Sequence, residues 1–205
     1  KAGPGSELAR MCYVALRIPG IRIKMAAPAA AGGAVAASGT ITIAGSWSTA
    51  GEGKWWIGGE LVSVALNSTH TTTTAAQAIR DAINANTKLP VTASSALGVV
   101  TITAKCASVR GNDYILHQDT SGLPSGMTST LAGGASVTGG GVKLSGGSGT
   151  ETMTTLLSAL FPGRYHRIAF AQNDATSAAA WETQLDTKAG YAEGRMEHAC
   201  LAHNG

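Results

Sequence analysis

Residue types that could form a hydrolytic site lie close together near the end of the sequence. His166, Asp174 and Ser177 supply a base, an acid and a nucleophile, but a catalytic triad is defined by its geometry in space and not by proximity along the chain. An α/β-hydrolase nucleophile stands in a G-x-S-x-G turn, whereas Ser136 and Ser148 have glycine two positions before and threonine two positions after. We therefore predict no catalytic residues and no enzymatic activity.

Metal-ligand and cofactor patterns are sparse as well. His198 and His203 are five residues apart on an expected strand, an odd spacing that puts their side chains on opposite faces. The glycine-rich stretch 133–149 lacks the G-K-[ST] of a phosphate loop and the distant acidic residue of a dinucleotide fingerprint. No C-x-x-C pair occurs among the three cysteines, which are Cys12, Cys106 and Cys200. We predict no metal, no cofactor and three small buried thiols.

Tryptophan and asparagine residues suggest two surface functions. Trp47, Trp55 and Trp56 could stack on sugar rings, but adjacent strand residues point to opposite faces, so Trp55 and Trp56 cannot serve one surface together. We expect one core tryptophan and one at an interface. The sequence Asn67-Ser68-Thr69 fits a glycosylation sequon, which we attribute to composition because no secretory signal is recognisable.

The N-terminal segment predicts a helix followed by a strand. Ser6 is the expected N-cap and Pro19-Gly20 ends the helix. Apolar residues recur between them at helical spacing, namely Leu8, Met11, Cys12, Ala15 and Leu16. Apolar and basic residues then alternate over residues 21–25, the period of a half-buried strand.

The middle of the chain predicts mainly strands. We expect them over residues 40–43, 55–57, 60–66, 91–93, 98–104 and 114–116. Gly58-Gly59 favours a tight hairpin, because both turn positions need positive φ. One helix begins at Thr74, where Thr74 and Gln77 fit a capping box, and ends near residues 84–86. The stretch 133–149 is expected to be a flexible connector.

The C-terminal part alternates helix and strand. A helix from Thr150 precedes a strand over 167–171, and a second helix from Asp174 or Thr176 to Gly190 precedes a strand over 198–202. Such alternation implies α/β layers with a mostly parallel sheet. We predict an α/β fold in which residues 1–30 and 147–205 form one discontinuous layered core. Residues 31–146 form an inserted β-rich (α+β) domain with one helix.

Charged residues are unusually few. The 205-residue chain has 44% hydrophobic residues and 13% charged residues, against roughly 25% charged in average domains. A disordered chain needs the opposite balance, and a surface of small uncharged residues suits contact with neighbouring molecules. The formal charge of +3 is local, since residues 1–24 hold five basic residues and one acidic residue. This charge is too small for nucleic-acid binding, and the apolar stretch 25–37 is too short to span a membrane.

In order and spacing, the segments of the chain resemble the Mu-like tail sheath proteins of contractile-tailed bacteriophages. The resemblance covers nearly the whole chain, through GSELARM at 5–11, AGGAVAASGTITI at 31–43, IGGELVSV at 57–64, residues 74–93, GVVTITAK at 98–105 and GND at 111–113. It continues through residues 165–174 and the following helix with Trp181 and Leu185.

The resemblance implies a structural protein without catalysis. Sheath proteins of this family have a subtilisin-like core without a working triad, and they stack as hexameric rings around the tail tube. Contraction of that lattice drives the tube through the host envelope. We accordingly expect other sheath subunits and the tail tube protein as partners, the virion tail as location, and assembly in the bacterial host cytoplasm. Terminal arms of the family extend beyond the present ends, so we interpret the chain as a fragment.

Two alternatives remain beside the sheath hypothesis. One is a catalytically remnant α/β hydrolase that uses Ser177 or His166. The other is a carbohydrate-binding module of a contractile injection apparatus that uses the tryptophans of the insertion.

Overall fold

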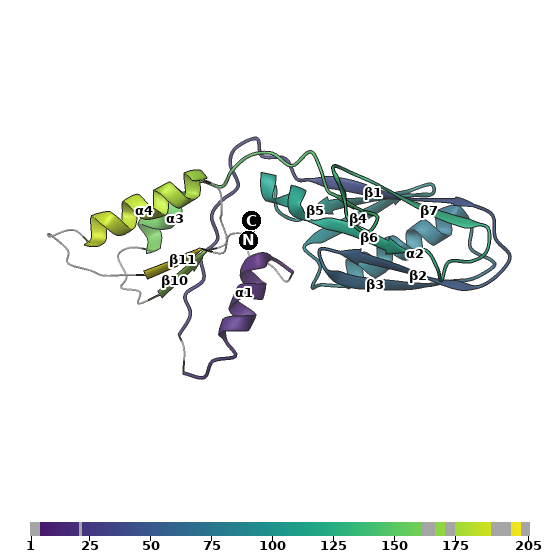
Figure 1. The fold of residues 1–205 in the computed structure, drawn as a ribbon, viewed down its shortest axis with the longest axis horizontal. Helices are drawn as coiled ribbons and strands as arrows, with labels where there is room; N and C mark the ends of the chain where they lie inside the picture. Colours follow the sequence, from purple (N-terminus) through teal and green to yellow (C-terminus); the bar gives the residue numbers. More distant parts are fainter. Residues whose placement is uncertain (1–4, 21, 161–166, 171–174, 190–197, 202–205) are drawn as a thin grey trace. The chain divides into compact units, whose positions relative to one another are not determined.

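The computed structural model describes residues 5–20, 22–160, 167–170, 175–189 and 198–201 (Figure 1). It separates into two compact units. Unit 1 contains Glu7–Ala31 and Glu151–Gly205, and unit 2 contains Gly3–Ser6 and Gly32–Thr150. Both units combine helices with strands, so the chain is a mixed α+β protein. None of the described helices has the length and apolarity that crossing a membrane requires.

Unit 2 is built on two antiparallel sheets. The four-stranded sheet has the order β4-β5-β1-β7, and the five-stranded sheet has the order β3-β2-β6-β9-β8. The strands are β1 (Ser38–Gly45), β2 (Gly51–Ile57), β3 (Glu60–Leu66), β4 (Val91–Ala96), β5 (Val99–Ala104), β6 (Ile115–Asp119), β7 (Met127–Ala132), β8 (Ser136–Val137) and β9 (Gly141–Lys143). A short 3-10 helix, η1 (Val109–Asp113), precedes β6.

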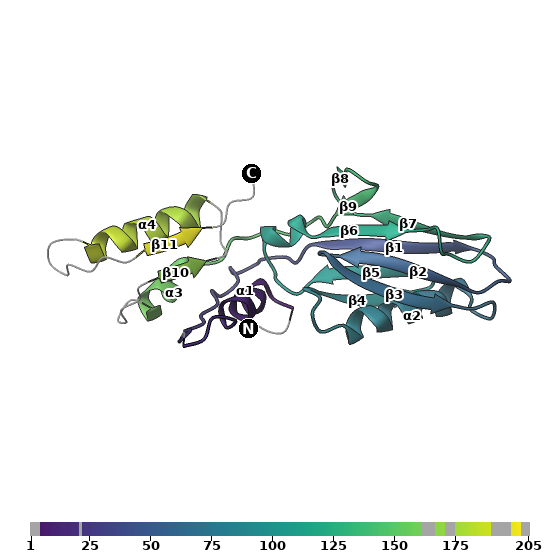
Figure 2. The ribbon, with the colours of Figure 1, turned by 60° about the horizontal axis from the view of Figure 1, so that its bottom comes forward.

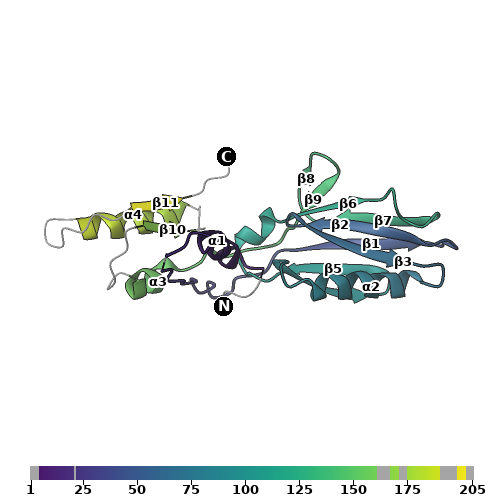
Figure 3. The same cartoon turned by 90° about the horizontal axis from the view of Figure 1, so that it is seen from below.

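The inner faces of the two sheets and the helix α2 (Thr72–Ala85) share one hydrophobic core. Every second side chain along β1, β2, β3 and β5 is buried in this core, because successive strand residues point to opposite faces. Helix α2 packs mainly against β4 and also against the edge strand β3 (Figure 2). The β8–β9 hairpin lies on the opposite side of unit 2 from α2 (Figure 3).

The predicted hairpin between β2 and β3 is confirmed. Gly58 and Gly59 have φ values of 57° and 84°, and the strands pair from Ile57–Glu60 outward. The predicted capping box at Thr74 and Gln77 is wrong. Thr71 is the N-cap instead, and it exchanges reciprocal bonds with Thr74, whose N–H donates to the Thr71 hydroxyl at 3.2 Å. In a run of four threonines, the first residue that could cap the helix does so.

The glycine-rich stretch 133–149 is not the flexible connector that its composition predicts. Its residues form β8 and β9, and β9 pairs with β6 through Leu116–Val142. The Leu144 side chain is 1% exposed, and its N–H donates to the Tyr114 carbonyl at 2.9 Å. The prediction fails because the partner strand lies far away in sequence, where local composition gives no signal.

Unit 1 contains α1 (Glu7–Ala15), α3 (Met153–Leu160), β10 (Arg167–Phe170), α4 (Ala175–Ala189) and β11 (His198–Leu201). The strands β10 and β11 pair in parallel. A small core cluster joins Met153, Leu156 and Leu157 of α3 with Trp181 of α4. The predicted helices and strands of the C-terminal part are confirmed as elements, while the expected cap at Gly190 lies outside the described residues.

Two predictions for the N-terminal segment are wrong. Residues 22–28 form no strand, and only Ala29 makes an isolated bridge, to Thr152. Although apolar and basic residues alternate here, no described strand pairs with this segment, so the pattern alone does not produce a strand. Leu16, expected on the buried face of the first helix, is 63% exposed because α1 ends at Ala15 and Leu16 enters the following turn.

Candidate assembly surface

The residues first considered for hydrolysis are only partly described. Ser177 lies in the first turns of α4 and is 1% exposed, so its hydroxyl is buried within unit 1. His166 and Asp174 lie outside the described residues. Of the three groups, the structure thus places only Ser177.

Metal-ligating residues do not gather in the described chain, which holds no group of three or more histidine, cysteine or acidic residues suited to an ion. His198 belongs to β11, and His203 lies outside the described residues. Cys12 is a buried free thiol and Cys106 a half-buried one, while Cys200 is part of β11.

The three insertion tryptophans have different surroundings. Trp55 is 1% exposed, and its indole N–H donates to the Ser129 hydroxyl at 3.4 Å. Trp56 is half-buried on the outer side of β2, where its ring meets the His117 ring edge-on with centroids 5.6 Å apart. Trp47 is half-buried and donates to the Asn67 carbonyl at 3.0 Å. Trp55 is thus the expected core tryptophan.

The sequon residues form an exposed turn before α2. The Asn67 side-chain oxygen accepts bonds from the Thr69 N–H at 3.1 Å, the Thr69 hydroxyl at 2.7 Å and the His70 N–H at 3.1 Å. Asparagine in such a turn organises the local backbone. The structure thus gives this motif a local folding role.

The outward side of the four-stranded sheet carries hydroxyl and small apolar groups. We call it the hydroxyl face, and its side chains alternate with the buried ones along all four strands. It consists of Ser38, Thr40, Thr42 and Ala44 of β1, Thr92, Ser94 and Ala96 of β4, Val99, Thr101 and Thr103 of β5, and Thr128, Thr130 and Ala132 of β7. None of these residues is charged.

The register aligns these hydroxyls in rows across the sheet. Thr101 stands opposite Ser94 on one side and Thr40 on the other, and Thr42 stands opposite Thr130. Cross-strand neighbours of this kind have Cβ atoms about 5 Å apart. The face is therefore an uncharged array of hydroxyl donors and acceptors, interrupted by Ala44, Ala96, Val99 and Ala132.

The outward side of the five-stranded sheet differs in charge. Glu52 pairs with Lys54 at 3.3 Å, and Lys54 stands opposite Asp119 in the register. The bond from the Ser63 hydroxyl, followed by Lys54, holds the pKa of Glu52 below its ordinary value. Bonds from the Ser121 hydroxyl and N–H likewise lower the pKa of Asp119. The two outward sheet faces of unit 2 are thus chemically distinct.

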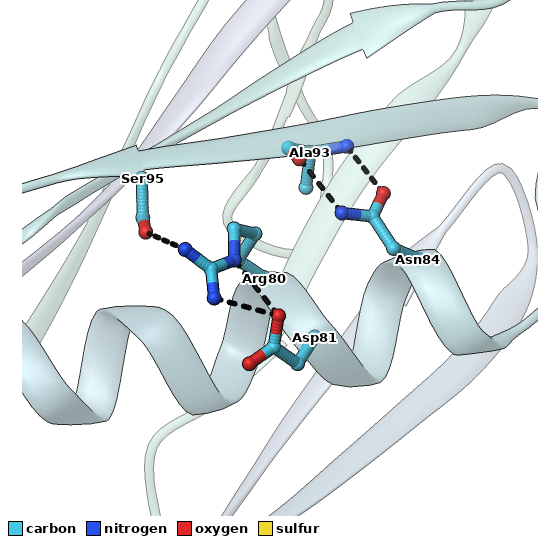
Figure 4. Close-up of polar contacts among 5 residues, drawn as sticks. All are labelled: Arg80, Asp81, Asn84, Ala93 and Ser95. Carbon is cyan, nitrogen blue, oxygen red and sulfur yellow. Dashed lines mark hydrogen bonds and ion pairs between the residues drawn. The ribbon is translucent and has the colours of Figure 1, made fainter.

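Side chains of α2 contact β4, an edge strand of the four-stranded sheet (Figure 4). The Asn84 amide donates to the Ala93 carbonyl at 2.8 Å and accepts from the Ala93 N–H at 2.9 Å. One turn earlier, Arg80 donates to the Ser95 hydroxyl at 3.2 Å and pairs with Asp81 at 2.8 Å. Asn84 therefore occupies backbone groups that an added strand would need.

Neither the hydroxyl face nor the contact between Asn84 and Ala93 was predicted from the sequence. The T-x-T spacing at 40–42, 101–103 and 128–130 was a usable signal, because alternate strand positions share a face. The Asn84–Ala93 contact had no such signal, since it depends on how α2 lies along β4. No protein-family model matches the sequence, and no curated protein matches it.

Proposed function

We propose that the chain is a structural subunit of a contractile phage tail sheath. Its copies stack as hexameric rings around the tail tube protein, in the tail of a virion assembled in the bacterial host cytoplasm. Contraction of the lattice then drives the tube through the host envelope. The protein acts by contact alone, without catalysis, cofactor or metal, and without nucleic acid or membrane as a partner.

The observation that supports this proposal best is the uncharged hydroxyl face on an inserted sandwich. Surfaces designed for solubility have charged residues at roughly a quarter to a third of their positions, whereas this face carries none. An uncharged β surface on a protein with 13% charged residues suits close packing among subunits. The resemblance of the ordered segments to sheath proteins points the same way.

The insertion itself is consistent with a separately folded module of such a subunit. The chain enters unit 2 near Val35 and leaves near Ser148, and these residues form an antiparallel bridge. Ser38 and Ser145 form a second one. We propose that the remaining chain from both ends forms a layered α/β core, with β10 and β11 as part of its parallel sheet.

Contraction in this proposal is a rigid-body rearrangement between two lattice geometries. The continuous core of unit 2 favours movement of the unit as a whole, because close-packed interiors resist gradual deformation. During contraction the contacts between copies change, while the hydrogen bonds within the two sheets of unit 2 persist.

The two competing functions have less support. The nucleophile that a hydrolase would use, Ser177, is buried in α4. A sugar platform would have to use Trp47 or Trp56, because Trp55 is enclosed in the core. Peptide or ester turnover lost in Ser177→Ala, or glycan binding lost in Trp56→Ala, would favour these functions over the sheath.

Sedimentation velocity of the purified protein over a range of concentrations tests the proposal. A sheath subunit gives large particles whose fraction rises with protein concentration. A single monomeric species at every concentration and salt condition would reject the proposal.

A further inference from the structure

We infer that Gly32-Gly33 is a hinge, about which unit 2 changes its direction as one body. The hinge lies where the chain passes between the two units, at residues 31–32 and 150–151. The inference concerns a single copy of the chain and goes beyond the proposed function, which states only that contraction moves rigid bodies. It is carried by the register of the two strands that cross this boundary, the space around Gly32-Gly33 and the hydrogen bonds beside it.

Isolated bridges join the strand that enters unit 2 to the strand that leaves it. Ala29 pairs with Thr152 in unit 1, and Val35 pairs with Ser148 in unit 2. From Ala29 to Val35 the entering strand advances six residues, whereas from Ser148 to Thr152 the leaving strand advances four. The entering strand therefore has two residues in excess, which interrupt the pairing as a bulge does.

Gly32 and Gly33 form a turn at this interruption and account for the excess. Without them, the bridges Ala29–Thr152 and Val35–Ser148 would share one register, and an antiparallel ribbon could run across the boundary. Between the two bridges, the entering and leaving strands share no backbone hydrogen bond in the described part of the chain. The two glycines thus separate two paired segments that would otherwise be continuous.

The glycines of the turn have room to rotate. A methyl group added at Gly32 or Gly33 would meet no described atom within 4 Å, and Gly33 has a φ of 77°, in the region that favours glycine. Gly147 on the leaving strand is enclosed instead, because an added methyl group would lie 2.6 Å from the Ser108 carbonyl oxygen. Gly32 and Gly33 can therefore change φ and ψ without a clash against surrounding residues, whereas Gly147 is held in place.

The unit 2 side of the boundary is fixed by hydrogen bonds. Val35 and Ser148 exchange both backbone bonds, at 3.1 Å and 3.0 Å. The Asn112 amide holds Gly147 through two further bonds, at 3.0 Å and 2.8 Å. Rotation is therefore concentrated in the unpaired residues just outside this base, which include Gly32-Gly33.

A third passage between the units, from Ser6 to Glu7, leaves the hinge free to act. Residues 22–28, between α1 and Ala29, form no helix or strand, so this part of the chain can follow a movement of unit 2. Hinges are typically a few residues that absorb changes of φ and ψ between units that move as wholes. In the sheath that we propose, such a joint lets unit 2 keep its neighbours while the rest of the chain changes place.

Two changes of length test the hinge in opposite directions. Deletion of Gly32 and Gly33 brings both bridges into one register, so it should couple the two units. Insertion of two further glycines after Gly33 should loosen them. The matched control is Gly140→Ala, which changes an open glycine with a φ of 84° in the turn between β8 and β9. Urea unfolding verifies that each variant is folded.

Single-molecule energy transfer measures the motion in solutions too dilute for copies to meet. One dye is attached at Leu97 in unit 2 and the other at Glu182 of α4 in unit 1, both exposed positions. Unnatural amino acids carry the dyes, so the native cysteines stay unmodified. A second pair, at Leu97 and the exposed Thr138, reports on unit 2 alone. The nanosecond donor decay records the spread of distances, because hinge motions take microseconds to milliseconds.

We expect the spread of distances between the units to be about twice the spread within unit 2 or more. The deletion should reduce it to the spread within unit 2, the insertion should increase it, and Gly140→Ala should leave it unchanged. Equal spreads in the wild-type, deletion and insertion proteins would overturn the hinge and leave the proposed function intact, because the measurement requires no assembly. If the deletion prevents folding, the insertion decides, and an unchanged spread in that variant overturns the hinge. Failure of the wild-type protein to assemble would overturn the proposed function alone.

Discussion

Three side-chain amides of unit 2 each donate one hydrogen bond and accept another from the same residue, as a paired peptide group does. Asn84 makes a bidentate pair with the backbone of Ala93. Asn112 does the same with Gly147, at 3.0 Å and 2.8 Å. Gln118 donates to the Ser129 carbonyl at 2.8 Å and accepts from the Ser129 hydroxyl. Backbone groups where a regular ladder stops are thereby satisfied.

Replacing Asn84 tests the value of one such pair. Asn84→Ala removes both bonds to Ala93, and we expect the free energy of unfolding to fall by about 1–2 kcal/mol. Urea unfolding followed by circular dichroism measures the change. Gln77→Ala, at an exposed position of the same helix, should stay within about 0.5 kcal/mol of wild type. Equal effects of the two substitutions would contradict the role of Asn84.

Glu52 should titrate at lower pH than an ordinary glutamate. Because its folded-state pKa is depressed, its carboxylate contributes stability above the unfolded-state pKa and loses that contribution as pH falls through the folded-state pKa. Carboxyl carbon NMR measures this titration. Ser63→Ala should raise the pKa of Glu52, since the Ser63 hydroxyl is the largest cause of the shift. A titration unchanged by the substitution would show that the bond is absent in solution.

Single residues differ in how far their surroundings could be predicted. The opposite placement of Trp55 and Trp56 follows from strand alternation alone. Asn84, in contrast, bonds to a residue on a separate element. Its partner depends on the packing of α2 against β4, which the local sequence does not encode.

At the scale of elements, local patterns predicted those helices and strands whose signals are contained in a short window. Gly58-Gly59 between alternating strands, and the apolar face of α3 with Met153, Leu156 and Leu157, are examples. The errors occur where pairing is long-range. Residues 22–25 continue an alternating pattern without gaining a strand partner in the described chain, and residues 141–143 pair with β6 without any periodic signal.

Leu144 distinguishes a structured segment from a connector. Its side chain is 1% exposed within the common core, so Leu144→Ala should lower the free energy of unfolding by about 2–5 kcal/mol. Val35→Ala, at a position 53% exposed, should have an effect below about 0.5 kcal/mol. Chemical unfolding of both variants gives the comparison. A negligible effect at Leu144 would support the flexible connector that the composition predicted.

At the scale of the whole molecule, the chain forms two units of which one interrupts the other. Unit 2 has its own core, and its entry and exit segments are bridged at Val35–Ser148. A module whose ends lie together can be inserted into a surface connection with little strain. Such an insertion was proposed from composition and from the alternation of elements at the two chain ends.

Residues 32–150 should fold without the rest of the chain. We expect the isolated segment to unfold in one cooperative urea transition with a β-type circular dichroism spectrum. Comparison with the same transition in the entire protein checks the independence of unit 2. A segment that binds hydrophobic dyes and lacks a cooperative transition would contradict it.

Electron microscopy of the purified protein is the most direct measurement of the central claim. We expect tubes of stacked rings with six subunits per ring. Images that contain only separate monomers, at high protein concentration and over a wide range of salt, would contradict the assignment of this chain as a sheath subunit.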